Sequence, residues 1–211
     1  MTTELHYKAN LRDLQFNLFE FLDVARTTLG KGPFEAMDEA TARQSLGAIE
    51  RLASGPIAAS FAACDRETPY IADDGTVVLP EALKRSMASF FDADWHRFEL
   101  PPHMGGYGAP PTLVWAGFEL LAGANPAVTY YLFAGAMART LDRLATPAQK
   151  ARYFPQMIDQ RWGTAMVLTE PDAGSDVGAA RARAVHVAGD EWRIEGVKRF
   201  ITNGDFDGTE N

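Results

Sequence analysis

Hydrophobic positions recur at helical spacing through the first three-quarters of the chain. Residues 11–29 and 39–63 each carry an apolar stripe with helical spacing, and Asn10 is the expected N-cap of the first. A kink is expected at Gly55-Pro56, because proline removes a backbone donor and clashes with the preceding turn. The pattern therefore predicts a helical region with local interruptions.

Later helices are predicted from their start signals. Proline at the first helical position favours a helix that begins at Pro80, and two apolar helices are expected over 112–122 and 127–144. Thr146 is followed by proline and glutamine in the pattern of a capping box, which predicts a helix over 147–152. The inner face of the helix after Pro80 is expected to hold Leu83, Met87, Phe90 and Phe91.

The apolar pair of helices raises the question of a membrane span. Glu119 is the only charge between Thr112 and Ala138, so this stretch approaches transmembrane length. Gly123-Ala-Asn-Pro126 lies in its middle, however, and helix breakers in lipid need neighbouring partners. Two buried helices joined by a turn explain the pattern better, and no membrane association is expected.

The pattern changes to that of strands after Gln160. Gly189-Asp190 predicts a hairpin turn, and Asn203-Gly204 predicts a second turn. Roughly 50 residues supply too few strands to close a sheet, so unpaired edges are expected, and the chain is expected to be a fragment or to need a partner. Strands are predicted over 162–168, 182–187, 192–195 and 197–202.

Composition narrows the class of protein. The 211 residues are 46% hydrophobic and carry a net charge of −8, so a globular core is expected and general nucleic-acid binding is not. The single cysteine, Cys64, excludes an internal disulfide and a thiolate zinc site. The first residues lack a basic segment followed by an apolar one, so a cytoplasmic location is expected.

Common catalytic motifs are absent from the sequence. Ser175 lies directly beside Gly174, which does not match the G-x-S-x-G elbow of serine hydrolases. Gly105-Gly-Tyr-Gly108 does not match G-x-G-x-x-G and follows no predicted strand. No metal is expected, because metal-ligand spacing is missing among His6, His96, His103 and His186.

Two strand ends combine hydroxyls, a glycine and an aromatic side chain. Thr169 ends the first predicted strand and is followed by Gly174 and Ser175, a glycine that permits close backbone approach and a small donor. About 30 residues later, Phe200 and Thr202 repeat the design before a turn. Such a pair would cradle a flat heterocycle such as a flavin, or a phosphate; plain turns between strands are the alternative interpretation.

At this point the sequence resembles the acyl-CoA dehydrogenases. The similarity runs from about residue 35 to the end, and the opening residues 6–20 resemble a bacterial subgroup of longer members. Four motifs carry it in the family's order: the P-x-x-x-G-G-x-G loop at 101–108, the Q-K-x-x-Y-L-P helix at 149–155, the first family signature at 166–176 and the following segment at 192–204.

This resemblance implies an α+β fold. Residues 1–160 correspond to the family's N-terminal helical domain, and 161–211 to the beginning of its middle flavin-binding β-domain, an antiparallel barrel or sandwich. By this resemblance, the family's C-terminal four-helix domain is expected to be absent from the 211 residues. The switch from helical to strand periodicity near residue 161 agrees with that order.

The resemblance also assigns cofactor contacts. Leu168 and Thr169 match residues at the pyrimidine edge of the flavin, and Thr202 matches a residue near N5, the hydride acceptor. Phe200 stands where the family usually has tryptophan, which keeps an aromatic face, and Ser175 also matches a contact to the substrate's CoA portion. The residues expected to contact FAD are Met166, Leu168, Thr169, Gly174, Ser175, Phe200 and Thr202.

The implied reaction is α,β-dehydrogenation of an acyl-CoA in fatty-acid or related catabolism, with electrons passed to electron-transfer flavoprotein. The family's general base is a glutamate of the C-terminal domain, so no catalytic residue is expected here; Glu170 is expected to be a structural loop carboxylate. A homodimer or homotetramer is implied for the whole protein. An acyl-CoA oxidase or related flavin monooxygenase, and a non-catalytic binding or scaffold subunit, remain alternatives.

Overall fold

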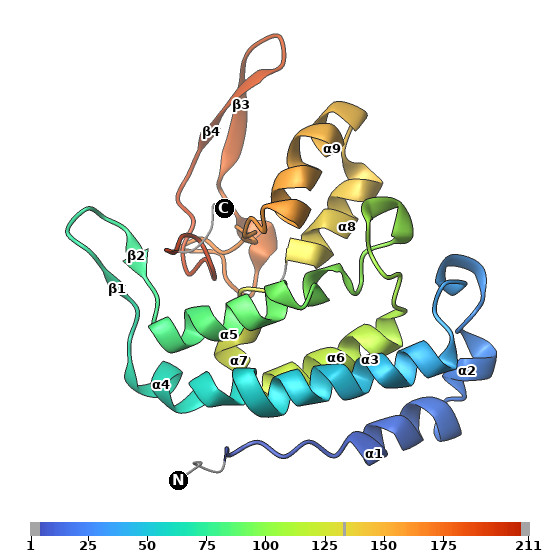
Figure 1. The fold of residues 1–211 in the computed structure, drawn as a ribbon. Helices are drawn as coiled ribbons and strands as arrows, with labels where there is room; N and C mark the ends of the chain where they lie inside the picture. Colours follow the sequence, from blue (N-terminus) through green and yellow to red (C-terminus); the bar gives the residue numbers. More distant parts are fainter. Residues whose placement is uncertain (1–4, 133, 208–211) are drawn as a thin grey trace.

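The computed structural model describes residues 5–132 and 134–207, and it consists of a helical body from which a long hairpin projects (Figure 1). The strands are β1 Tyr70–Ile71, β2 Val77–Val78, β3 Arg183–Ala188 and β4 Glu191–Glu195. The helices are α1 Leu11–Gln15, α2 Val24–Thr27, α3 Glu39–Leu52, α4 Phe61–Arg66, α5 Glu81–Asp92, α6 Pro111–Ala124, α7 Pro126–Thr129, α8 Ala134–Leu144 and α9 Pro147–Phe154.

Several predicted helix signals are confirmed. The Asn10 side chain accepts a hydrogen bond from the Asp13 N–H at the start of α1. The chain leaves α-geometry at 53–60, around Gly55-Pro56, where π and 3-10 turns replace it before α4. At α9, Thr146 and Gln149 form both bonds of the predicted capping box. These local signals work because each satisfies or removes specific backbone donors.

Other helix predictions need correction. The helix expected over 11–29 breaks at Asp23, whose φ of 49° is left-handed, and 16–21 forms a π-helix. Pro80 is the N-cap of α5 and not its first helical residue. The helix expected over 127–144 divides into α7 and α8, and residue 133 lies outside the described residues. The helix expected over 147–152 runs to Phe154, with Pro155 as its C-cap, and a π-helix over 155–159 follows it.

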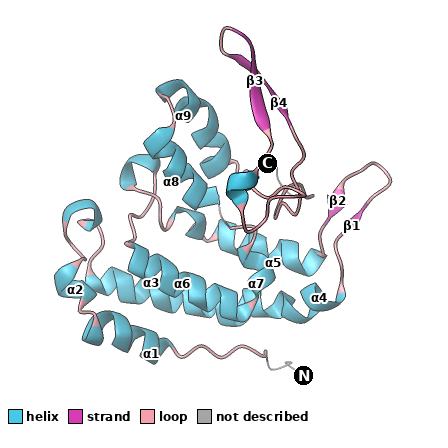
Figure 2. Cartoon of the chain, turned by 180° about the vertical axis from the view of Figure 1, so that it is seen from behind, coloured by secondary structure: helices cyan, strands magenta, loops and turns pink. Residues whose placement is uncertain are grey.

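The core lies between the long helices, where α3 and α6 run side by side (Figures 1 and 2). Leu46 of α3 and Leu113 of α6 are fully buried. A Cβ on Gly117 would lie 3.0 Å from the Ile49 side chain, so glycine permits the close approach of the two helices. The predicted inner face of α5 is buried as expected, at Leu83, Met87, Phe90 and Phe91.

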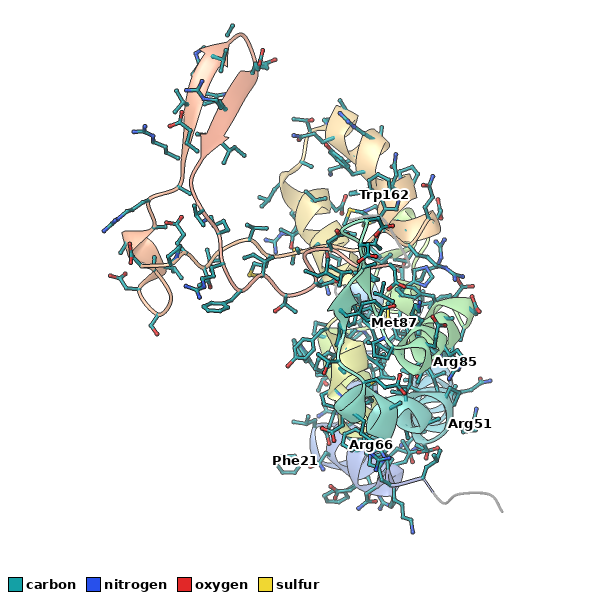
Figure 3. All side chains as sticks on the ribbon, turned by 90° about the vertical axis from the view of Figure 1, so that its left-hand side faces the viewer. Phe21, Arg51, Arg66, Arg85, Met87 and Trp162 are labelled. Carbon is teal, nitrogen blue, oxygen red and sulfur yellow. The ribbon has the colours of Figure 1, made fainter. Side chains whose placement is uncertain are left out.

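The predicted hairpin is confirmed, and it is the magenta pair labelled β3 and β4 in Figure 2. Strands β3 and β4 pair antiparallel from Arg183↔Glu195 to Ala188↔Glu191, with a bulge between His186 and Ala188. Most of its side chains are exposed, which agrees with the expectation of unpaired edges. The hairpin extends away from the helices in the side-chain view (Figure 3), while Trp162 lies against them.

Two predicted strands are wrong in the described part of the chain. Residues 162–168 and 197–202 form no β-ladder with any described residue. A β-strand needs a series of backbone hydrogen bonds to a partner, and these segments make isolated ones instead. A hairpin that the pattern did not predict, β1–β2, pairs Tyr70 with Val78 around an Asp74-Gly75 turn. The result remains α+β: a helical domain followed by short antiparallel strands.

The end of the described chain returns to the helical body. Phe206 is buried edge-on against Tyr131, and the Asp207 carboxylate accepts from the Leu79 N–H and the Lys84 ammonium, each at 2.6 Å. These contacts anchor the chain beyond residue 161 to α5. Across the described ranges, no helix is both long enough and apolar enough to span a bilayer.

Candidate functional site

A cavity of about 390 Å³ lies where the helical body meets the segments around β3 and β4. It falls within the usual size range of small-molecule sites. Two extended segments and the α7–α8 region form its walls. The lining residues are Tyr130, Met137, Thr164, Met166, Leu168, Thr169, Phe200, Thr202 and Asn203.

The structure brings together most of the residues that the sequence singled out. Two loop residues, Gly174 and Ser175, do not line the cavity. A Cβ added to Gly174 would meet nothing within 4 Å, so no contact inside the chain requires glycine there and its surroundings are open. The predicted residues that do line the cavity are Met166, Leu168, Thr169, Phe200 and Thr202.

Cross-links between the two extended segments explain their proximity. The Arg199 N–H donates to the Thr169 carbonyl at 3.0 Å, and the Asn203 Nδ2 donates to the Thr164 carbonyl at 3.3 Å. Asn203 adopts a left-handed φ of 59°, which asparagine tolerates better than most residues. Each segment therefore satisfies part of the other's backbone without forming a regular ladder.

The walls offer hydroxyls, thioether and aromatic surface. The Thr164 Oγ1 is buried and has no hydrogen-bond partner among the described residues, which is uncommon for a buried polar atom. Phe200 is 78% exposed, and the Arg199 guanidinium lies 4.6 Å from its ring centroid. Its φ of 57° is left-handed, an outlier for a bulky residue that is characteristic of functional sites. The cavity therefore has an exposed aromatic ring, that of Phe200, and a buried hydroxyl, that of Thr164, without a hydrogen-bond partner among the described residues.

Glu170 follows the first segment and is only 6% exposed. Its carboxylate accepts from the Arg181 N–H at 2.6 Å, the Ala182 N–H at 3.0 Å and the Lys198 ammonium at 2.8 Å. The Lys198 bond, followed by the two backbone bonds, lowers the pKa of Glu170 to about 2. A carboxylate that is ionised and occupied in this way is a structural loop group, as the sequence analysis expected.

The histidines are engaged in separate contacts. His96 is buried, with its Nε2 3.1 Å from the Ile158 carbonyl, and burial lowers its pKa. The His103 Nε2 lies 2.9 Å from the Asp142 carboxylate. Among the described residues, no group of three or more His, Cys, Asp or Glu side chains could hold a metal ion.

Four lining residues escaped the sequence analysis: Tyr130, Met137, Thr164 and Asn203. Thr164 occupies the same alternating register as Met166 and Leu168, so extending that alternation back by two residues would have found it. Asn203 was read as a turn residue alone. Tyr130 and Met137 come from the helical domain, and local sequence carries no signal that places them beside a segment 30 residues later.

Comparisons with known proteins identify the class. The family described as "Acyl-CoA dehydrogenase, N-terminal domain" matches residues 48–161. The chain is 46% identical, over 95% of its length, to the broad-specificity linear acyl-CoA dehydrogenase FadE5 of Mycobacterium tuberculosis, and covers 33% of that protein. It is 32% identical, over 97% of its length, to the 3-methylmercaptopropionyl-CoA dehydrogenase of Ruegeria pomeroyi, and covers 35% of it.

A solved structure shares the fold. The Tcur3481-Tcur3483 steroid ACAD superposes with a TM-score of 0.58 at 22% identity, covering 80% of this chain and 41% of that one. The fold is thus that of a helical domain leading into antiparallel strands. The chain belongs to the acyl-CoA dehydrogenase family. It spans about a third of the length of the two curated relatives just named.

Proposed function

We propose that this chain forms the helical domain and one flavin-binding wall of an FAD-dependent acyl-CoA dehydrogenase. The observation that carries the proposal is the cavity in which Thr169 and Thr202, from segments more than thirty residues apart, lie together with Phe200. Membership of the acyl-CoA dehydrogenase family supports the reaction class. The relatives' names support an acyl-CoA substrate.

The residues present fit a flavin. An isoalloxazine ring has apolar faces and a polar pyrimidine edge, and the cavity offers Met166 and Phe200 for the faces and threonine hydroxyls for the edge. Thr164 Oγ1, buried without a partner among the described residues, adds hydrogen-bonding capacity that a polar ligand atom would satisfy. The open space at Gly174 leaves room for close approach to the neighbouring loop.

FAD held here would supply the acceptor for the β-hydride of an acyl thioester whose α-proton a base would remove. Leu168 and Thr169 would hold the pyrimidine edge of the flavin, Thr202 would contact it near N5, and Phe200 would cover a ring face. Ser175 and Gly174 serve the flavin and the CoA portion from the adjacent loop. These residues bind and orient the reactants, which is where positioning contributes to rate.

The base itself would come from outside this chain's residues. Glu170 is unsuited to the role, because its pKa of about 2 leaves it a weak base and its oxygens are occupied. We further propose electron-transfer flavoprotein as the electron acceptor, a homodimer or homotetramer as the assembly, and a role in fatty-acid or related acyl-CoA catabolism. The free, half-buried Cys64 suits a reducing, cytoplasmic compartment.

Removing the two cavity hydroxyls tests the flavin wall. In the protein as its cell makes it, Thr169→Val and Thr202→Val are each expected to weaken FAD retention by about tenfold, the value of one hydrogen bond, and to shift the flavin's visible spectrum. Dialysis followed by absorbance and acyl-CoA turnover measures both effects. Thr112→Val on the exposed surface of α6 is the matched control. Wild-type spectra and turnover in both cavity variants would rule out this wall.

A further inference from the structure

Lys198 makes two contacts at the edge of the candidate flavin cavity. Its ammonium donates to the Leu168 carbonyl at 3.0 Å and to the Glu170 carboxylate at 2.8 Å. The next residue, Arg199, donates its N–H to the Thr169 carbonyl at 3.0 Å. Lys198 and Arg199 therefore bind acceptors on three consecutive residues, 168, 169 and 170. These bonds fix the position of the first extended segment at the cavity.

The contact to the Leu168 carbonyl has a consequence for Thr169. The peptide between these residues is planar and trans, so its C=O and N–H point in opposite directions. The ammonium that fixes the carbonyl also fixes the N–H of Thr169 on the far side of the peptide plane. No described residue accepts that N–H, and Thr169 lines the cavity.

Glu170 holds the Lys198 ammonium in a fixed position. Its carboxylate is tied to the backbone at 181 and 182, at the base of β3, and is almost fully buried. The Lys198 side chain is 27% exposed, and its carboxylate partner 6%. An ion pair in this setting is held in one geometry, because both charges would lose hydrogen bonds on moving apart.

We propose that Lys198 is a positioning residue of this site: anchored by Glu170, it sets the orientation of the Leu168–Thr169 peptide that faces the flavin. This inference rests on the proposed function. Lys198 acts through the peptide and not on the reactants themselves. The low pKa of Glu170 keeps its carboxylate ionised at neutral pH.

The test compares two lysines with matched environments. Lys84 has a side chain 26% exposed and pairs with the Asp207 carboxylate at 2.6 Å, but neither Asp207 nor its other partner, Glu81, lines the cavity, whereas Lys198 contacts Leu168, which does. In the FAD-loaded protein, Lys198→Met is expected to shift the flavin spectrum and to lower kcat by about 10- to 100-fold, as small misplacements do. Lys198→Arg is expected to recover part of both effects. Lys84→Met is expected to lower the unfolding temperature and leave spectrum and kcat unchanged.

A flavin spectrum and kcat that stay at wild-type values in Lys198→Met, or that change no more than in Lys84→Met, would overturn the proposal. If Lys198→Met does not fold, Glu170→Gln decides, because it removes the negative charge that holds the ammonium, although its single amide oxygen can accept only one of the two backbone N–H groups. A folded Glu170→Gln protein with a wild-type spectrum and kcat counts against the positioning role. Wild-type protein that binds no FAD contradicts the proposed function instead, whatever the variants do.

Discussion

Gly106→Ala is expected to destabilise the protein by about 3 kcal/mol, the upper end of the usual cost of overpacking, because the added Cβ would meet backbone atoms as well as a side chain. A Cβ at this position would lie well under 3.0 Å from the Leu100 carbonyl and side chain. That carbonyl already accepts the Gly108 N–H at 2.9 Å, and Ala109 donates to Phe98 at 3.0 Å. These hydrogen bonds join residues 98–100 to residues 108–109, so the two sides of the loop are in close contact.

Thermal unfolding checks this expectation, with a fall of at least about 6 °C for a protein of this size. Gly47→Ala is the control, since a Cβ there would make only ordinary contacts of 3.5 Å or more and the residue lies within α3. The control is expected to be neutral or slightly stabilising. A Gly106→Ala protein that unfolds at the wild-type temperature would mean that the loop is not closed as described.

Leu113→Ala is expected to lower the free energy of unfolding by about 2–5 kcal/mol, because it opens a cavity in a closely packed core. Leu113 is fully buried on α6, which packs against α3. Gly117 and Ile49 hold the two helices in close contact, so the site has little freedom to collapse into the space.

Denaturant unfolding, followed by helical circular dichroism, measures the loss. Leu144→Ala removes the same atoms from a side chain that is 80% exposed, and is expected to change stability by less than about 0.5 kcal/mol. Equal effects of the two substitutions would show that Leu113 does not belong to the core.

The sequence predicted those features of the fold that depend only on residues close together in the chain, such as helix caps and kinks. The Thr146 capping box, the Asn10 cap and the kink at Gly55-Pro56 each depend on residues within four positions. The β3–β4 hairpin likewise follows from its turn. Strands at 162–168 and 197–202 were predicted wrongly, because alternation indicates an extended backbone but cannot supply the pairing partner.

The sequence singled out some of the residues that line the candidate cavity and missed others. Motif resemblance selected five residues that share one cavity, although their hydroxyls and ring carry little signal individually. The Glu170–Lys198 pair was missed as a pair, since 28 residues separate the two and neither position reveals its partner. The left-handed Phe200 was missed as well, because its φ of 57° opposes the extended conformation that its neighbours suggest.

The most direct test of the account is anaerobic mixing of the protein, purified from the cell that makes it, with saturated acyl-CoAs of increasing chain length. The predicted result is bound FAD whose visible absorbance is lost as the enoyl-CoA forms, and whose absorbance returns slowly when oxygen is admitted afterwards. Fast reoxidation would assign the protein to the oxidases. Protein that carries no flavin, or flavin that stays oxidised with every acyl-CoA, would contradict the central claim that these segments form the wall of a dehydrogenase site.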